Sequence, residues 1–313
     1  FPMPELPEVH TTATMLNELI SGLQITDVWT DLGGSIHKGK DHIKDPKFFQ
    51  KFRVGVAGAK IKNVDRRGKN VLIHLDIGQT ILVHMKMTGQ LLYGKYKRIT
   101  NHQETKTKQG WEAVEPEELK DPFSRFVHFV ISFTNGQHMA LSDMRKFAKI
   151  TLLETATSHL SEHLADIGPE PLEESFDFKK FQARLLTRPK GKIKQVLMEP
   201  AVVSGIGNIY SDEILWDSDV HPLSIVSKIP EKELKKIFAS TKLLLKKGID
   251  FGGDSMSDYR TPIGTKGSFQ HHHQAYHKFG EKCAKKGCRG TISKLKAGGR
   301  TAHFCAVHQK CYT

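Results

Sequence analysis

The residues Phe126-Val-His-Phe-Val-Ile-Ser-Phe133 and His138-Met-Ala-Leu141 are apolar runs on either side of Asn135-Gly136. Asn-Gly is a strong short-range signal for a two-residue turn between antiparallel strands. Two more apolar runs, residues 71–75 and 80–85, are separated by Gly78. Because these runs follow one another with no helical spacing between them, they predict an antiparallel β-sandwich that extends to about residue 150.

An amphipathic helix precedes the expected sheet. Val9, Leu16 and Ile20 recur at helical spacing, and Gly22 lies where such a helix would end. Residues 97–121 are mostly polar, and we predict a loop for them.

After residue 153 the spacing of the apolar residues becomes helical. The helical stretches are residues 178–185, 193–197 and 234–245. We expect the third helix to begin after Pro230 and to stop at Gly248. Residues 251–268 are rich in Gly, Ser and Asp, which predicts a mobile loop.

The charge balance narrows the class of partner. Lys and Arg number 47 against 34 Asp and Glu, which gives a formal net charge of +13. An excess of this size favours a polyanion, with nucleic acid first and an anionic membrane surface second. No run approaches the roughly 18 apolar residues of a membrane span, and no secretory signal is expected in the first thirty residues.

All four cysteines lie in the C-terminal tail. Cys283 and Cys288 form one close pair, and Cys305 with His308 forms a second pair sixteen residues later. Two close pairs at this separation predict a zinc ribbon, in which the spacer folds as a hairpin. His308 repeats the short spacing and is the preferred fourth ligand, with Cys311 as the alternative. Four protein ligands leave no open position on the metal, so we expect one structural Zn²⁺.

A glycine turn, Gly205-Ile-Gly-Asn208, leads into a further predicted helix. The exposed N–H groups of a helix N-terminus bind phosphate well, and the basic run of residues 188–194 precedes this turn. The alternative is that Asn208 caps the helix and that the turn merely joins two helices.

These motifs together resemble the formamidopyrimidine-DNA glycosylases, within the wider group that includes endonuclease VIII. They occur in family order and span nearly the whole chain. The matching residues are Pro4-Glu-Leu-Pro-Glu-Val9, Lys69, His84-Met-Lys-Met-Thr-Gly89, Asp143-Met-Arg-Lys-Phe147, Gly168-Pro-Glu-Pro-Leu172, Gly205-Ile-Gly-Asn-Ile-Tyr210, His221-Pro222 and the cysteine tail.

The resemblance implies an α+β multidomain fold. An N-terminal antiparallel β-sandwich with flanking helices would occupy residues 1–150 and carry the catalytic residues. A helical helix–two-turn–helix DNA-binding domain would follow at 151–250, a lesion-recognition loop region at 251–274 and the zinc finger at 275–313. The resemblance also implies a monomer in a bacterial-type cytoplasm, associated with the nucleoid through DNA.

The resemblance further implies a bifunctional DNA glycosylase/AP lyase of base excision repair. Such an enzyme excises 8-oxoguanine and formamidopyrimidines from damaged double-stranded DNA and then nicks the strand by β,δ-elimination. The amine of Pro4 would attack the sugar and Glu5 would act as general acid. Lys69 and Arg300 would bind phosphate and assist the two eliminations.

The DNA-binding residues are also implied by the resemblance. Met87, Arg145 and Phe147 would fill the gap left by the flipped nucleotide, which suits an apolar plug, a guanidinium and an aromatic wedge. The remaining DNA-binding residues would be His128, Lys190, Lys194, Asn208 and Tyr210.

Three alternatives stay open on the sequence. Residues 1–3 precede the motif, so the amine mechanism requires processing that leaves Pro4 as a free N-terminus. If that end stays blocked, a non-catalytic lesion-binding protein is the alternative. An endonuclease VIII-like glycosylase for oxidised pyrimidines is the second alternative, and the lesion preference is not readable from the loop. Residues 271–273, three histidines, would bind metal or phosphate or simply lie in a polar loop.

Overall fold

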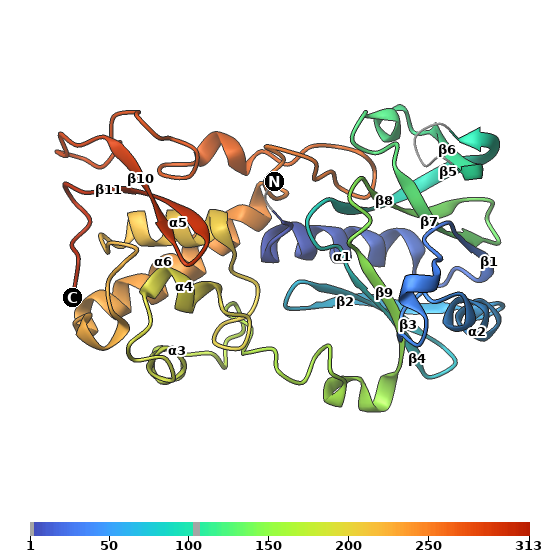
Figure 1. Ribbon diagram of the computed structural model, residues 1–313, viewed down its shortest axis with the longest axis horizontal. Coiled ribbons are helices and arrows are strands. Elements are labelled where there is room, and N and C mark those ends of the chain that lie inside the picture. The colour runs from blue at the N-terminus through green and yellow to red at the C-terminus, as the bar shows by residue number, and fades with distance from the viewer. Residues whose placement is uncertain (1–2, 103–106) are drawn as a thin grey trace.

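The computed structural model describes residues 3–102 and 107–313. It has a β-sheet body at one end and a helical body with a hairpin at the other, and the helix α1 (Leu6–Ile20) extends from the junction into the β body (Figure 1). Among the described residues, no helix is long and apolar enough to cross a membrane.

The β body consists of two antiparallel sheets, which confirms the predicted sandwich architecture. One sheet has the order β2-β3-β4-β9 and the other β1-β7-β8-β5-β6. The strands are β1 (Ile25–Thr30), β2 (Ile61–Arg67), β3 (Asn70–Leu75), β4 (Gln79–His84), β5 (Gly89–His102), β6 (Thr107–Glu115), β7 (Val127–Phe133), β8 (His138–Asp143) and β9 (Lys149–Glu154). The helix α2 (Pro46–Val56) packs against this body through Phe52 and Val56.

Helix α1 belongs to both hydrophobic cores. Val9, Leu16 and Ile20 are buried in the core of the β body, as their spacing predicts. Leu6, at the beginning of the same helix, is buried in the core of the helical body. The residues just before Leu6 are therefore held at the junction of the two bodies.

Two predictions for the β body need correction. Residues 97–121 are not a loop, because most of them belong to β5, β6 and the short 3₁₀ helix η2. Tyr96, Trp111 and Leu119 form a small buried core under this hairpin. The turn at Asn135-Gly136 has three residues rather than two, because the Phe133 N–H donates to the carbonyl of Gln137.

The helical body contains α3 (Phe178–Leu186), α4 (Ile193–Met198), α5 (Asn208–Asp217) and α6 (Glu231–Asp250). The prediction that α6 stops at Gly248 is wrong, because the helix continues to Asp250. A Cβ at Gly248 would lie 2.2 Å from the Tyr210 hydroxyl, so glycine allows α5 and α6 to approach each other here. The short 3₁₀ helices of the chain are Ser35–His37, Glu117–Lys120, Thr155–Leu160, Val226–Lys228 and Phe269–His272.

Residues 251–268 are irregular, as predicted, but they are packed against both bodies. The Arg260 guanidinium is buried and pairs with Asp121 of the β body at 3.0 Å. The Tyr93 N–H of β5 donates to the carbonyl of Pro262 at 2.6 Å. The segment is therefore held by buried contacts, which the prediction of a mobile loop did not include.

The C-terminal hairpin consists of β10 (Ile292–Ala297) and β11 (Arg300–Cys305), paired in antiparallel register. It packs on α5, where the His303 N–H donates to the Asp212 carboxylate at 3.0 Å. The hairpin between the two cysteine-containing pairs is therefore confirmed.

Candidate active site

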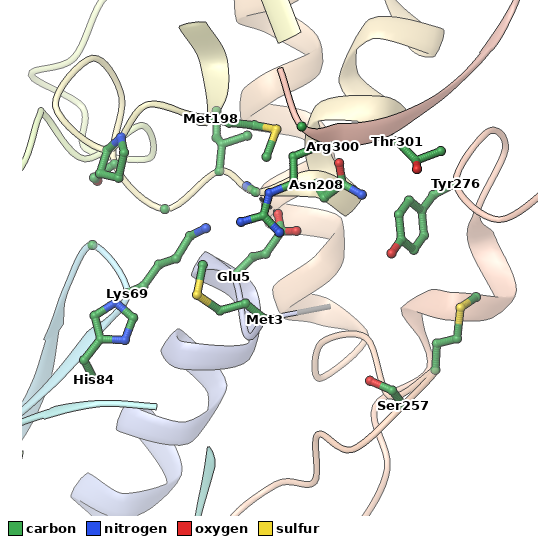
Figure 2. Close-up of a pocket in the computed structure, with 18 of the residues that line it drawn as sticks. Met3, Glu5, Lys69, His84, Met198, Asn208, Ser257, Tyr276, Arg300 and Thr301 are labelled. Atoms are coloured by element: carbon green, nitrogen blue, oxygen red, sulfur yellow. Dashed lines mark hydrogen bonds between the residues drawn. The ribbon is translucent and has the colours of Figure 1, made fainter. Parts of the chain in front are cut away.

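A cavity of about 1200 Å³ lies where the N-terminal segment, the β body, the helical body and the hairpin meet. It brings together Glu5, Lys69, Asn208 and Arg300, four predicted site residues that are far apart in the sequence (Figure 2). Other lining residues include Met3, Asn70, His84, Met198, Ser257, Tyr276, His277, Lys294 and His303.

The Glu5 carboxylate is buried and caps α5 from the other body. It accepts hydrogen bonds from the N–H groups of Gly207 at 2.6 Å, Ile209 at 2.8 Å and Tyr210 at 3.3 Å. A Cβ at Gly207 would lie 2.4 Å from the Glu5 carboxyl carbon, so only glycine permits this approach. The carboxylate occupies the helix N-terminus, and the N-cap residue of α5 is Gly207, so the alternative prediction that Asn208 caps the helix is wrong. The turn does join two helices, α4 and α5.

The charges around Glu5 act in opposite directions. Burial raises the pKa of Glu5, whereas the Lys69 ammonium and the three N–H donors lower it. Burial lowers the pKa of Lys69, and Glu5 and Glu8 oppose that shift. A raised pKa increases the fraction of a carboxyl group that carries a transferable proton at a given pH, and a neighbouring ammonium can stabilise the anion left after transfer.

Glu8 supports Glu5 from outside the cavity lining, and the sequence analysis gave it no role. Its buried carboxylate accepts from the Glu5 N–H at 2.7 Å, from the Asp254 N–H at 2.8 Å and from the Tyr210 hydroxyl at 3.2 Å. Burial, followed by the charges of Glu5 and Asp254, raises the pKa of Glu8 to about 8. The signal in the sequence is the spacing of Glu5 and Glu8 at a helix start, which is the capping-box pattern.

Pro4 is buried directly before Glu5, and Met3 lies in the cavity (Figure 2). Residues 1 and 2 are outside the described part of the chain. The nitrogen of Pro4 is bonded to Met3 here, so this structure presents an amide at that point.

Arg300 reaches the cavity from the tip of the hairpin. It is exposed and follows Gly298-Gly299, both with positive φ, in the turn between β10 and β11. Lys294 of β10 also lines the cavity. The hairpin therefore adds two positive charges to the wall opposite Lys69.

The tail contains a group of residues that could hold a metal ion. The ligand atoms of Cys283, Cys288, Cys305 and His308 all lie within 4.8 Å of one another. The sulfurs of Cys288 and Cys305 are 3.6 Å apart, and Cys283 Sγ is 3.4 Å from His308 Nδ1. These separations fit tetrahedral zinc, for which Zn–S bonds of about 2.3 Å place two sulfurs roughly 3.8 Å apart.

The histidine of this group is oriented by a second contact. His308 Nε2 is 3.1 Å from the Trp216 carbonyl, so a proton on Nε2 leaves the Nδ1 lone pair facing the thiols. Cys311 is exposed and lies outside the group. The donor set thus favours His308 over Cys311, as the sequence spacing does.

Met87, Arg145 and Phe147 form a cluster on the surface. The Arg145 guanidinium is 3.0 Å from the Met87 sulfur and lies 4.5 Å from the centre of the Phe147 ring. Phe147 is 50% exposed although its sequence pattern is that of a core residue. An exposed aromatic ring held beside an arginine fits insertion into a base stack better than it fits packing.

Three predicted DNA-contacting side chains are turned inward, which corrects the sequence assignment. His128 is buried and pairs with Asp31 at 2.8 Å. Lys194 is fully buried, and its ammonium is 2.6 Å from Asp212 and 2.9 Å from Ser211. Tyr210 is buried, stacked on Phe269 with ring centres 4.9 Å apart. All three side chains therefore have their partners inside the fold.

The other predicted residues lie where a ligand can reach them. Lys190 is exposed in the turn before α4, and Asn208 lies at the first turn of α5 with its side chain in the cavity (Figure 2). The three histidines of residues 271–273 do not act together. His272 stacks on Phe251, and His273 is buried 2.6 Å from Asp254. Among the described residues, neither belongs to a group of side chains that could hold a metal ion.

His84 also belongs to the cavity wall, although no role was assigned to it from the sequence. Burial, with the charges of Lys86 and Lys69, lowers its pKa to about 3. The ring is therefore neutral near pH 7 and can accept or donate a hydrogen bond there.

Comparison with known proteins gives this geometry a family. Residues 3–150 match the formamidopyrimidine-DNA glycosylase N-terminal domain, and residues 167–260 match the formamidopyrimidine-DNA glycosylase H2TH domain. The chain belongs to the formamidopyrimidine-DNA glycosylase family. Membership makes the protein a DNA glycosylase and confirms both the family and the enzyme class predicted from the sequence.

Full-length relatives support the assignment. The formamidopyrimidine-DNA glycosylase of Streptococcus pyogenes serotype M3 is 35% identical over 315 residues, which covers 98% of this chain and 99% of the relative. That of Pelotomaculum thermopropionicum is 32% identical over 308 residues, with the same coverage.

Solved structures of the family superpose on most of the chain. A complex between Lactococcus lactis Fpg and abasic-site DNA has a TM-score of 0.77 at 29% identity and covers 98% of this chain and 99% of that one. A complex between a Lactococcus lactis Fpg mutant and Fapy-dG DNA has a TM-score of 0.77 at 30% identity, covering 98% and 100%.

Proposed function

We propose that the protein is a bifunctional DNA glycosylase/AP lyase that removes oxidised purines, including 8-oxoguanine and formamidopyrimidines, from damaged double-stranded DNA. Family membership and the relatives' complexes with Fapy-dG, carbocyclic 8-oxo-G and abasic-site DNA support base excision repair of such lesions. The net charge of +13 suits this polyanionic partner.

The observation that carries the proposal is the position of Glu5. Its buried carboxyl group has a raised pKa and lies in the cavity wall, one residue after Pro4 and near Lys69. When Pro4 is the first residue, its secondary amine is free at this place. An α-amine titrates near pH 8, so a substantial fraction is neutral and nucleophilic at physiological pH.

The chemistry then proceeds through the sugar. The Pro4 nitrogen forms a bond to C1′ as the bond from C1′ to the base breaks. The base leaves with the bonding electrons and takes up the proton that the Pro4 nitrogen loses, so the nitrogen regains the lone pair that opens the sugar. Glu5 donates its proton to the ring oxygen as the sugar opens, which leaves an iminium between Pro4 and C1′. Loss of a C2′ proton expels the 3′ phosphate, and a second elimination expels the 5′ phosphate. Lys69 and Arg300 are positioned to neutralise these phosphates.

The cysteine-containing tail has a structural part in this scheme. We infer one Zn²⁺ bound by Cys283, Cys288, Cys305 and His308, which fixes the hairpin on α5. Because Arg300 lies at the tip of that hairpin, the metal holds the arginine at the cavity without taking part in the reaction.

Borohydride trapping tests the proposal. Protein beginning at Pro4 is incubated with duplexes that contain 8-oxoguanine, thymine glycol or an abasic site, and the iminium is reduced to a stable adduct. We expect adducts with the 8-oxoguanine and abasic duplexes, and none from Pro4→Gly or from protein that retains residues 1–3. Stronger trapping with thymine glycol would favour the pyrimidine-specific alternative. No adduct with any duplex from folded protein would exclude the amine mechanism.

A further inference from the structure

Four residues other than glycine have positive φ in the described part of the chain: Lys86, Lys146, Asp219 and His277. The left-handed region is costly for residues with a Cβ, so such positions are retained where something compensates the strain. Asp219 has an internal explanation, because its carboxylate pairs with Lys285 at 2.7 Å and with Lys236 at 3.4 Å. The other three lie at the cavity or at the surface cluster described above.

Lys86 lacks such an internal explanation. Its φ is +57°, and it lies between His84, which lines the cavity, and Met87, which contacts Arg145. Its backbone N–H donates to His84 Nδ1 at 3.0 Å. Within residues 3–102 and 107–313, no hydrogen bond or ion pair of its ammonium is found. No polar contact of the side chain therefore offsets the conformational cost of the left-handed backbone.

The surroundings of Lys86 are positively charged. The half-buried Lys44 donates its ammonium to the Lys146 carbonyl at 2.7 Å. Burial lowers the pKa of Lys44, Asp143 opposes that shift, and the charge of Lys86 adds to it. Lys149 is partly neutralised by Asp41 at 3.2 Å, yet its charge, after burial, lowers the pKa of Lys86. These like charges repel one another, and a bound anion would relieve the repulsion.

We propose that Lys86 binds a backbone phosphate of the DNA strand beside the inserted Met87, and that its left-handed turn is kept for that contact. The proposal rests on the DNA-binding function proposed above and adds a phosphate contact to it. Lys86 would hold the DNA backbone between the cavity and the cluster of Met87, Arg145 and Phe147. The nucleotide beside Met87 would then stay in a fixed position relative to the cavity.

The variant Lys86→Gly distinguishes an effect on DNA binding from an effect on the stability of the fold. Lys86→Gly removes the charge and also the strain, so its melting temperature should equal that of the parent or exceed it by up to about 3 °C. Its affinity for a duplex with a stable abasic analogue should fall about fivefold at ~0.15 M salt and only about twofold at ~0.5 M. The reason is that each phosphate contact contributes about 0.9 to the slope with which the logarithm of the binding constant falls against the logarithm of the salt concentration.

Three variants complete the experiment. Lys86→Arg keeps the charge and should bind like the parent, whereas Lys86→Ala should lose the same affinity without gaining stability. Lys51→Ala removes an exposed charge on α2, and its salt slope should change much less. If Lys86→Gly binds like the parent at both salt concentrations, or loses affinity equally at both, the phosphate contact is excluded. A parent that does not bind the duplex would instead contradict the proposed function.

Discussion

The N-terminal segment and the surface cluster of Met87, Arg145 and Phe147 differ in burial: the first is enclosed between the two bodies, and the second lies at the surface. Glu5 and Glu8 are buried, and each accepts hydrogen bonds from segments of the other body. Met87, Arg145 and Phe147 contact mainly one another at the surface. The difference teaches that the two buried carboxyl groups join the two bodies, whereas the surface cluster should be free to change without cost to the fold. Activity and stability should therefore be lost together in the first region and separately in the second.

Glu5→Gln should give the largest effect and should change both quantities. Removal of a general acid lowers the rate of base excision by about 10²- to 10⁴-fold. The amide also faces N–H donors of α5 with its own NH₂ group, and an unmade buried hydrogen bond costs about 1–3 kcal/mol. Single-turnover excision and thermal unfolding measure the two effects.

The exposed Glu174→Gln is the matched control for Glu5→Gln and should change neither quantity. A Glu5→Gln protein that loses activity while keeping the parent's melting temperature would show that the carboxylate does not join the two bodies.

Removal of the metal should have the next largest effect. A chelator that strips zinc should release the hairpin. The phosphate contact proposed for Arg300, and the one that we expect for Lys294 of the same hairpin, would then be lost together. Two such contacts correspond to about 20- to 30-fold in affinity at ~0.15 M salt. Fluorescence anisotropy with an abasic-analogue duplex measures this loss, and added zinc should restore binding.

The fourth ligand can be tested in the same assay. His308→Ala should bind DNA like the metal-free protein, whereas Cys311→Ala should bind like the parent, because Cys311 lies outside the ligand group. The reverse result would move the metal to Cys311.

Glu8→Gln should change how stability depends on pH. The pKa of Glu8 is raised from 4.5 to about 8 in the fold. A raised pKa means that the folded state binds the proton more tightly, so this contribution is complete below about pH 4.5 and is lost as the pH rises through 8. The parent should lose a few kcal/mol of unfolding free energy across that window, and Glu8→Gln should lose clearly less. Equal pH profiles from urea unfolding would show that Glu8 is ionised throughout.

Part of this comparison could be predicted from the sequence. Short apolar runs and an Asn-Gly turn indicate the sandwich, and paired ligands at a fixed separation indicate the metal group, because both signals are local. Whether a side chain points into the core or to solvent is not determined by its neighbours in the sequence. Lys194 and Lys190 belong to one basic run, yet the first is buried against Asp212 and the second is exposed. The role of Glu5 as the cap of α5 required the partner, more than 200 residues away, to be placed first.

Phe147→Ala should have the smallest effect on the fold, and a buried ring makes the contrast. Phe129 lies in the core of the β body and is fully buried, so Phe129→Ala should cost about 3–5 kcal/mol of unfolding free energy. Phe147 is 50% exposed, and Phe147→Ala should stay within about 0.5 kcal/mol of the parent. Excision from an 8-oxoguanine duplex should nevertheless slow about tenfold, since losing one aromatic stacking contact costs about 1–3 kcal/mol. Urea unfolding and single-turnover excision on the same samples test both statements. A Phe147→Ala protein that unfolds more easily than the parent would place the ring in the packing of the fold, and the distinction between the two regions would fail.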